Sequence, residues 1–221
     1  METLPYLEQT KSWPRAGKHI LAQYDDESIV VYQAYHPVIG EFAAKYQYFG
    51  GEFNYTRWSW IKTNFLWVMY RSGWGTKQGQ ETILRVTLKK DFFDALLTEA
   101  VESSRNGHLY ATEKAWKTAL ARSNVRLQWD PDHGPTGGKL QRRAIQLGLR
   151  GRALEEYGKE AIIKIDNISE FVTQQRPYIT KEERHQLQTP VENVYCPTSE
   201  AAERNIGLSE CPIDTDYRNR L

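Results

Sequence analysis

The segment from Arg57 to Trp74 constrains this chain more than any other, because it holds four of the seven tryptophans in one short stretch. Lys62, Tyr70 and Arg71 lie between these rings. Cations beside wide aromatic faces suit a polyanionic or flat aromatic ligand, while large rings also build protein cores. Alternate residues of an extended segment point to opposite faces, so one segment can serve both purposes. The sequence therefore predicts a ligand site at this block without naming a reaction.

The composition limits the class of protein to which the chain can belong. With 221 residues, 40% of them hydrophobic, it can form one domain with a sizeable core. A formal net charge of +1 gives no overall attraction to nucleic acid or to membranes, so any basic surface must be local. The N-terminus lacks the apolar core of a signal peptide, and no apolar run has the length of a membrane span. We expect a soluble, intracellular (cytoplasmic) protein with no membrane partner.

Hydrophobic periodicity predicts a mixture of strands and helices. The segment 28–35 has a continuous apolar beginning, which is typical of a central strand buried on both faces. Residues 64–70 are apolar and fit either a short helix or a buried strand. The other extended segments are expected at 53–60, 82–88, 125–129, 140–149 and 161–168, and the other helices at 38–49, 91–102, 113–121 and 153–159.

Polarity and proline content divide the chain into three parts. Residues 1–17 are expected to form an N-terminal arm, residues 18–172 an α+β domain, and residues 173–221 an irregular C-terminal extension. The two cysteines, Cys196 and Cys211, lie in that extension outside any CxxC pattern, so we expect no structural zinc site. The sequence does not indicate an oligomeric state.

A second concentration of unusual residues is the WDPDH segment with the strand that follows it. Asp130, Asp132 and His133 are expected in a loop, where they would either serve a metal-assisted hydrolase or stabilise a turn. The spacing implies no distant ligand, so no metal is expected. Arg142 and Arg143 should lie on opposite faces of the next strand, and the one that points inward needs a carboxylate or a bound phosphate.

Four phrases occur in order along the chain: IVVYQAYHPVIGEFA, RWSWIKTNFLWVMYRSGWGTK, VRLQWDPDH and RRAIQLGLRG. Together they resemble the family catalogued as domain of unknown function 4291 (DUF4291). The resemblance covers about residues 18–172, and the aromatic block is its most specific part. It implies a shared fold and gives no activity.

The order of elements is similar, more loosely, to that of ADP-ribosyltransferases. This resemblance implies one α+β domain with a mixed, mostly antiparallel split sheet flanked by helices, and NAD as the substrate. In such enzymes a strand end grips the nicotinamide ribose and an aromatic segment stacks on the nicotinamide. The NAD-binding residues that it implies here are Gln33, Tyr35, Lys62, Tyr70, Arg71 and Trp74.

The chain departs from that pattern at the catalytic acid. Most such enzymes place a glutamate near the start of the penultimate core strand, where this sequence has no acid between Gln141 and Gln146. Asp130 or Asp132 would have to substitute, and with Gln146 they are the candidate catalytic residues. The interleaved cations and rings favour DNA or RNA as the acceptor.

A non-catalytic module that binds single-stranded nucleic acid fits the same residues. The bases of the bound strand would stack on Trp58, Trp60 and Trp74. The cations expected at the phosphates are Arg57, Lys62, Lys77 and Arg143. Steep salt dependence of binding would distinguish this module from the enzyme.

Overall fold

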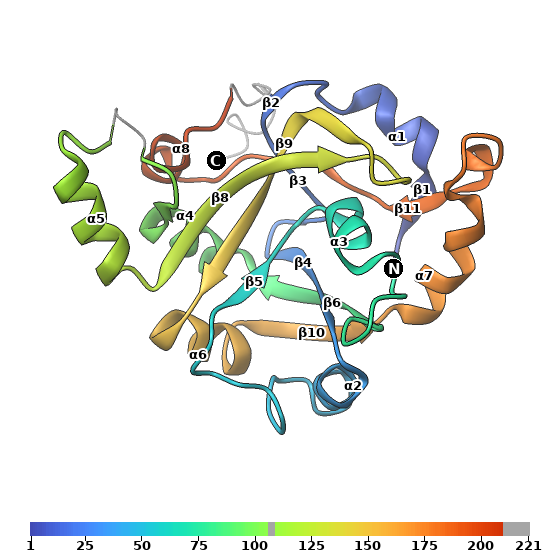
Figure 1. Cartoon of the computed structure of the whole chain (residues 1–221), viewed down its shortest axis with the longest axis horizontal. Helices are drawn as coiled ribbons and strands as arrows, with labels where there is room; N and C mark the ends of the chain where they lie inside the picture. The colour runs from blue at the N-terminus through green and yellow to red at the C-terminus, as the bar shows by residue number, and fades with distance from the viewer. Residues whose placement is uncertain (106–108, 210–221) are drawn as a thin grey trace.

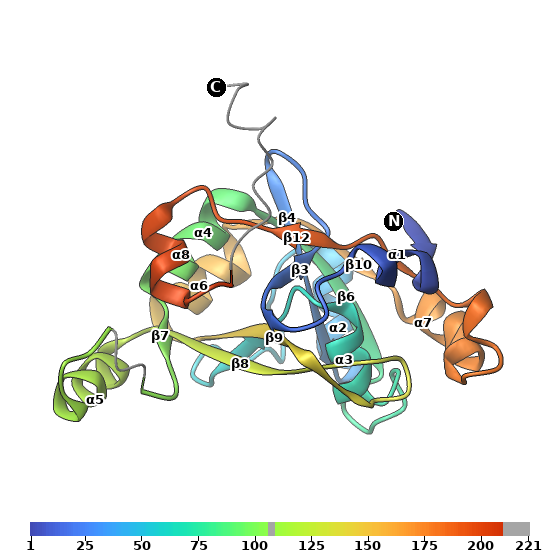
Figure 2. The same cartoon turned by 90° about the horizontal axis from the view of Figure 1, so that it is seen from above.

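Two sheets face each other across one hydrophobic core (Figures 1 and 2). The computed structural model describes residues 1–105 and 109–209. Ile29 and Val31 enter this core from one sheet, and Leu127 and Leu147 enter it from the other. Burial of such side chains is the main favourable term in folding.

The first sheet contains three antiparallel strands in the order β10, β6, β4, with bounds Ile162–Asn167, Thr82–Lys89 and Ser28–Tyr35. Alternation along β4 places Val31 between the sheets, while Val30 and Tyr32 belong to a second apolar cluster. The prediction that this strand is buried on both faces is confirmed. The prediction that it is central is wrong, because β6 lies in the middle and β4 makes only isolated bridges elsewhere.

The second sheet is built on a long antiparallel hairpin of β8 (Val125–His133) and β9 (Lys139–Leu149). Three short strands extend it. Strand β2 (Gly17–Lys18) runs parallel to β9 near its start, and β5 (Ser59–Ile61) runs antiparallel to β9 near its end. Strand β7 (Val101–Glu102) runs parallel to β8. The sheet is therefore mixed.

The loop expected after Trp129 is much shorter than the turn-forming residues suggested. Strand β8 continues to His133 and pairs with β9 through Asp130 and Pro131. Proline has no N–H to donate, and the pairing register shifts immediately after it. Asp130 and Asp132 are therefore strand residues, held more rigidly than loop residues would be.

Six α-helices, α2 to α7, follow β4 along the chain before the C-terminal segment. The ambiguous segment forms the helix α3, because the side chain of Asn64 accepts a hydrogen bond from the backbone N–H of Trp67 and caps it. Helix α2 ends before the expected stop at Gly50, since Gln47 adopts a left-handed conformation (φ 64°). The bounds are α2 Pro37–Tyr46, α3 Phe65–Ser72, α4 Lys90–Glu99, α5 Glu113–Arg122, α6 Gly151–Lys159 and α7 Ser169–Gln175.

The two ends of the chain pair with each other. Strand β1 (Thr3–Pro5) pairs with β11 (Gln188–Pro190), and β3 (Ile20–Ala22) pairs with β12 (Asn193–Tyr195). The side chain of Asn205 donates to backbone carbonyls at the end of α4. The remaining elements are α1 Tyr6–Ser12, the 3-10 helices η1 Arg176–Ile179 and η2 Arg184–Gln186, and α8 Glu200–Ile206.

The described part of the chain is thus an α+β domain with mixed and antiparallel sheets and eight α-helices. The α+β prediction is confirmed. Within residues 1–105 and 109–209, no helix has the length and apolar character needed to cross a bilayer.

Close packing of α2 on β6 gives a test of this architecture. A Cβ added at Gly40 would lie 2.3 Å from Cγ2 of Thr82, so one of the two elements must move. We expect Gly40→Ala to lower the free energy of unfolding by about 1–3 kcal/mol in urea titrations. Gly138→Ala is the control, because its Cβ meets no atom within 4 Å. Equal unfolding midpoints for the two variants would contradict the packing described.

Candidate functional site

A polar hollow of about 420 Å³ opens where the end of β4, strand β5 and helix α3 meet. These elements lie side by side at the centre of Figure 1. A larger hollow of about 630 Å³ runs along α5, but that helix alone supplies its lining, so it is open surface. Among the described lining residues, the central hollow has three cations and no acid; its lining includes Gln33, Tyr35, residues 57–60, Lys62, Trp67 and Arg71.

Hydrogen bonds lock β4 to β5 beside the hollow. The Gln33 Nε2 group donates to Ser59 Oγ and to the carbonyl of Trp60, each at 3.0 Å. The hydroxyl of Tyr157 donates to Gln33 Oε1 at 2.5 Å, and the hydroxyl of Tyr35 lies 2.9 Å from Ser59 Oγ. These bonds occupy the amide of Gln33, so its part in the site is to position the neighbouring strand.

Helix α3 turns Trp67 and Arg71 toward the hollow. The two residues are four apart and therefore lie on one face of the helix. The Asn64 cap fixes where this face begins, and Gly73 ends the helix in a left-handed conformation (φ 59°). The indole N–H of Trp67 is buried and has no acceptor among the described residues. A buried donor without a partner is a group that a ligand can satisfy.

Lys62 is the most perturbed cation of the hollow. Its Nζ lies 4.7 Å from the ring centroid of Trp67 and donates at 3.5 Å to the carbonyl of Trp60. Within the described residues it forms no ion pair. Burial lowers the pKa of Lys62 to about 7, an effect that Asp130 opposes and Arg71 reinforces. Burial therefore disfavours the charged form of this amine.

Asp130 does not line the hollow, but its carboxylate is electrostatically coupled to Lys62 and Arg71. Its Oδ2 accepts from Gln146 Nε2 at 2.5 Å, and the same nitrogen donates to Gln128 Oε1 at 2.6 Å. Burial raises the pKa of Asp130, while the charges of Lys62 and Arg71 oppose that shift. Two of the three candidate catalytic residues, Asp130 and Gln146, are thus in direct contact.

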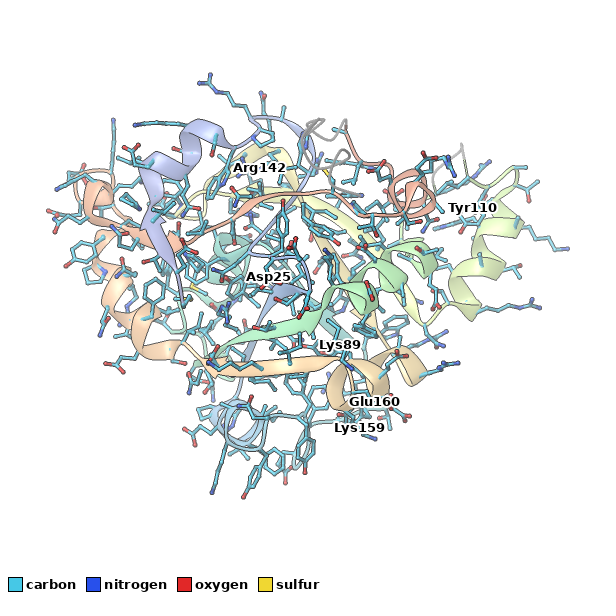
Figure 3. All side chains as sticks on the ribbon, turned by 180° about the vertical axis from the view of Figure 1, so that it is seen from behind. Asp25, Lys89, Tyr110, Arg142, Lys159 and Glu160 are labelled. Carbon is cyan, nitrogen blue, oxygen red and sulfur yellow. The ribbon has the colours of Figure 1, made fainter. Side chains whose placement is uncertain are left out.

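The third candidate, Asp132, belongs to a buried ion pair. Its Oδ2 accepts from Arg142 Nη2 at 2.5 Å and from Nε at 2.8 Å. Arg142 Nη1 also donates to the carbonyl of Pro14 at 2.6 Å, beside the N-terminal segment (Figure 3). Arg142 is buried and Arg143 is exposed, which confirms that one of the two arginines points inward to a carboxylate. Since Asp132 neutralises that arginine, Asp130 is the stronger catalytic candidate.

The C-terminal segment holds the start of α3 in place. Glu192 Oε1 accepts from the backbone N–H of Phe65 at 2.6 Å, and the carbonyl of Glu192 accepts from Trp13 Nε1 at 2.7 Å. Burial raises the pKa of Glu192 well above its ordinary value. The ends of the chain therefore support the helix that lines the hollow.

Tyr70 and Trp74 contact the tip of the β8–β9 hairpin and lie outside the lining of the hollow. The ring of Tyr70 stacks on His133, with centroids 3.6 Å apart and an interplanar angle of 8°. Trp74 Nε1 donates to the carbonyl of Pro135 at 2.9 Å. In the described part of the chain neither ring nitrogen of His133 has a partner, and burial lowers the pKa of this imidazole.

The lining of the hollow thus includes most of the residues that the sequence analysis named for binding NAD or nucleic acid. Lys77 and Arg143 are exposed and outside its lining, although Lys77 Nζ donates to the carbonyl of Arg71 at 3.2 Å. The predicted residues that line it are Gln33, Tyr35, Arg57, Trp58, Trp60, Lys62 and Arg71.

Two arginines next to the site escaped the sequence analysis. The guanidinium carbons of Arg126 and Arg150 lie 4.3 Å and 4.9 Å from the ring centroid of Trp58. Arg126 shares a face of β8 with Gln128 and Asp130, so strand alternation could have found it.

The acidic residues of the hairpin do not converge on a metal site. In residues 1–105 and 109–209, no group of three or more His, Cys, Asp or Glu side chains could hold a metal ion. Asp132 is engaged with Arg142, and His133 is stacked on Tyr70. Nothing in this geometry supports the metal-assisted hydrolase.

Comparison with known families gives one match. The family model described as "Domain of unknown function (DUF4291)" matches residues 19–195. This range includes every residue of the hollow and reaches into the C-terminal segment that supports α3. No curated protein matches the chain.

Exchanging each aspartate of β8 for asparagine should separate structure from catalysis. Asp132→Asn leaves Arg142 buried without its counter-charge, so the free energy of unfolding should fall by about 3–5 kcal/mol. Asp130→Asn keeps an oxygen that accepts from Gln146, so the loss should be about 1 kcal/mol or less. Chemical denaturation measures both, and equal losses would contradict the assignment of Asp132 to structure.

The environment of Lys62 predicts a pH-dependent stability difference. Its pKa in the folded protein lies below that of an unfolded lysine, so the fold disfavours the charged form. This cost is complete below about pH 7 and disappears as the pH rises toward the unfolded value of about 10.4. Lys62→Met should therefore stabilise the protein at pH 6, and its advantage should shrink steadily toward pH 10.

Urea titrations at pH 6, 8 and 10 measure this difference. The exposed Lys77 provides the control, and Lys77→Met should stay within about 0.5 kcal/mol of the wild type throughout. A Lys62→Met advantage that does not change with pH would show that the amine is not perturbed.

Proposed function

The chain belongs to the DUF4291 family, and we propose that it is an NAD-dependent, ADP-ribosyltransferase-like enzyme that cleaves the bond between nicotinamide and ribose. One observation carries the proposal: Arg57, Lys62 and Arg71 line a single hollow that has tryptophans in its wall. The carboxylate of Asp130, outside this lining, is electrostatically coupled to Lys62 and Arg71. Such a set of groups suits a ligand that has an anionic centre and flat aromatic ends.

The three cations suit the pyrophosphate of NAD. Within the described chain no carboxylate neutralises Arg57 or Arg71, so their guanidinium groups are free to donate to phosphate oxygens. Lys62 is held in place by the ring of Trp67. A bound phosphate would favour the charged amine and raise its pKa from about 7.

The aromatic groups of the hollow suit the rings of the ligand. Trp58 and Trp60 have centroids 6.5 Å apart and planes 30° from parallel. Both line the hollow and are only half-buried, so they offer stacking surface to a nicotinamide or an adenine. The unpaired N–H of Trp67 supplies a directional donor.

Asp130 is the group suited to the chemical step. When the bond to nicotinamide breaks, the ring leaves as a neutral molecule with the electron pair, and positive charge develops on the ribose. A carboxylate fixed nearby stabilises that charge more than it stabilises the ground state. Gln146 holds the carboxylate through one oxygen. The positive nicotinamide of bound NAD would also counter the burial that raises the pKa of Asp130.

Calorimetric titration with NAD tests the proposal. Wild-type protein should bind, and Arg71→Ala should weaken binding about 10- to 100-fold, as expected for the loss of one or two charge-assisted hydrogen bonds. Arg204→Ala is the control, because this exposed arginine of α8 pairs with Glu200 and does not line the hollow.

A second readout separates binding from chemistry. Asp130→Asn should bind NAD with nearly the wild-type affinity yet release free nicotinamide at least about 100-fold more slowly, the size of effect seen when one electrostatic group is removed. The absence of NAD binding at millimolar concentration would overturn the proposed function.

A further inference from the structure

Trp58 joins the hollow to a second group of cations. Its ring lines the hollow, and the guanidinium groups of Arg126 and Arg150 lie within 4.3 Å and 4.9 Å of the ring centroid. Arg126 belongs to β8, and Arg150 directly follows β9. We call Trp58, Arg126 and Arg150 the arginine shelf.

The charges of the arginine shelf are not neutralised. In the part of the chain that the structure describes, no carboxylate pairs with Arg126 or Arg150. The Nε of Arg126 is buried and has no acceptor among the described residues. Arg150 donates only to backbone carbonyls of described residues, at 3.1 Å to Ser123 and 2.5 Å to Ala121. The net charge of the chain is only +1, yet these two arginines have no carboxylate partner among the described residues. Trp58 connects them to a hollow that is lined by three further cations.

The geometry of the shelf preorganises its donors. A guanidinium held on an indole face loses little further freedom when it binds a phosphate. The carbonyl bonds of Arg150 fix it at the C-terminal end of α5, which projects from one end of the molecule (Figures 1 and 2). None of the residues of α5 is buried, and Lys114 and Arg122 on it are exposed. The helix next to Arg150 therefore carries further exposed cations.

We propose that the arginine shelf binds the phosphates of a single-stranded nucleic acid and presents one of its nucleotides to the hollow as the acceptor. The acceptor role rests on the proposed function, whereas the binding does not. The phosphates of a strand suit two unpaired guanidinium groups held over one indole ring, and half-buried tryptophans suit unpaired bases. A single strand fits better than a duplex, because a nucleotide must leave the stack to enter a recess.

The transfer that this arrangement serves is balanced without another reactant. The bond between the ribose carbon and nicotinamide breaks, and nicotinamide leaves with the electron pair. A new bond forms between that carbon and a nitrogen or oxygen of the presented nucleotide. The proton lost by this nucleophile passes to the carboxylate of Asp130 or to water.

Fluorescence anisotropy with labelled oligothymidine and oligouridine of about 15 nucleotides tests the proposal, since single-strand sites span about 4–16 nucleotides. The titrations run without NAD, between 50 and 200 mM salt. Wild-type protein should bind with affinity that falls steeply with salt. Arg126→Gln and Arg150→Gln should each reduce the slope of log K against log salt by about 0.7 for every phosphate that the variant no longer neutralises.

Arg204→Gln is the matched control and should leave affinity and slope unchanged, because Arg204 lies on α8 and is paired with Glu200. Arg126→Gln removes no hydrogen bond from the described structure, so the circular dichroism spectrum and thermal midpoint should match the wild type. Wild-type slopes in both shelf variants, or tighter binding of a duplex than of either single strand, would overturn the proposal.

The same variants distinguish this inference from the proposed function. Arg126 does not line the hollow, so Arg126→Gln should bind NAD like the wild type. Weaker nucleic-acid binding in the shelf variants with no NAD binding in any protein would support the shelf and overturn the enzyme. NAD binding without nucleic-acid binding would support the enzyme and overturn the shelf.

Discussion

Positive charge without a partner is the constraint that shapes this site. Arg57, Lys62 and Arg71 converge on one hollow, and the structure as described gives none of them a carboxylate at ion-pair distance. The cost is visible at Lys62, whose pKa burial lowers to about 7. Burying an unpaired charge costs free energy, and a bound anion would offset that cost. The neighbouring segments must therefore hold these cations in place.

Most of the structure serves as that frame. The amide of Gln33 ties the first sheet to β5, and the carboxyl of Glu192 fixes the start of the helix that carries Arg71. The buried pair of Asp132 with Arg142 joins the hairpin to the N-terminal segment. Segments from both ends of the chain therefore support the walls of the hollow. None of these three interactions involves the side chain of Arg57, Lys62 or Arg71.

The sequence predicted which cations and rings come together better than it predicted the packing around them. The aromatic block pointed to residues that line the hollow, and strand alternation indicated that at most one of Arg142 and Arg143 points inward and needs a carboxylate or a phosphate. The length of β8 was missed, because turn-forming residues such as Asp130 and Pro131 suggested a loop, while pairing with β9 overrode that local preference. Likewise, no local signal could show that His133 stacks on Tyr70, since the two residues meet only through tertiary packing.

The arrangement of charge suits the two proposed polyanions in different ways. Asp130 is the carboxylate coupled to the cations of the hollow, while the arginine shelf beyond Trp58 has none in the described residues. A dinucleotide would meet both phosphate-binding and cation-stabilising groups. A nucleic-acid strand lying on the shelf would meet only phosphate-binding groups.

A crystal structure of the protein grown with ADP-ribose tests the central claim most directly. We predict electron density for the ligand in the hollow, with its pyrophosphate bonded to Arg57, Lys62 or Arg71 and its terminal ribose facing Asp130. Density for the ligand at any other surface, with the hollow empty, would contradict the assignment of this site to NAD.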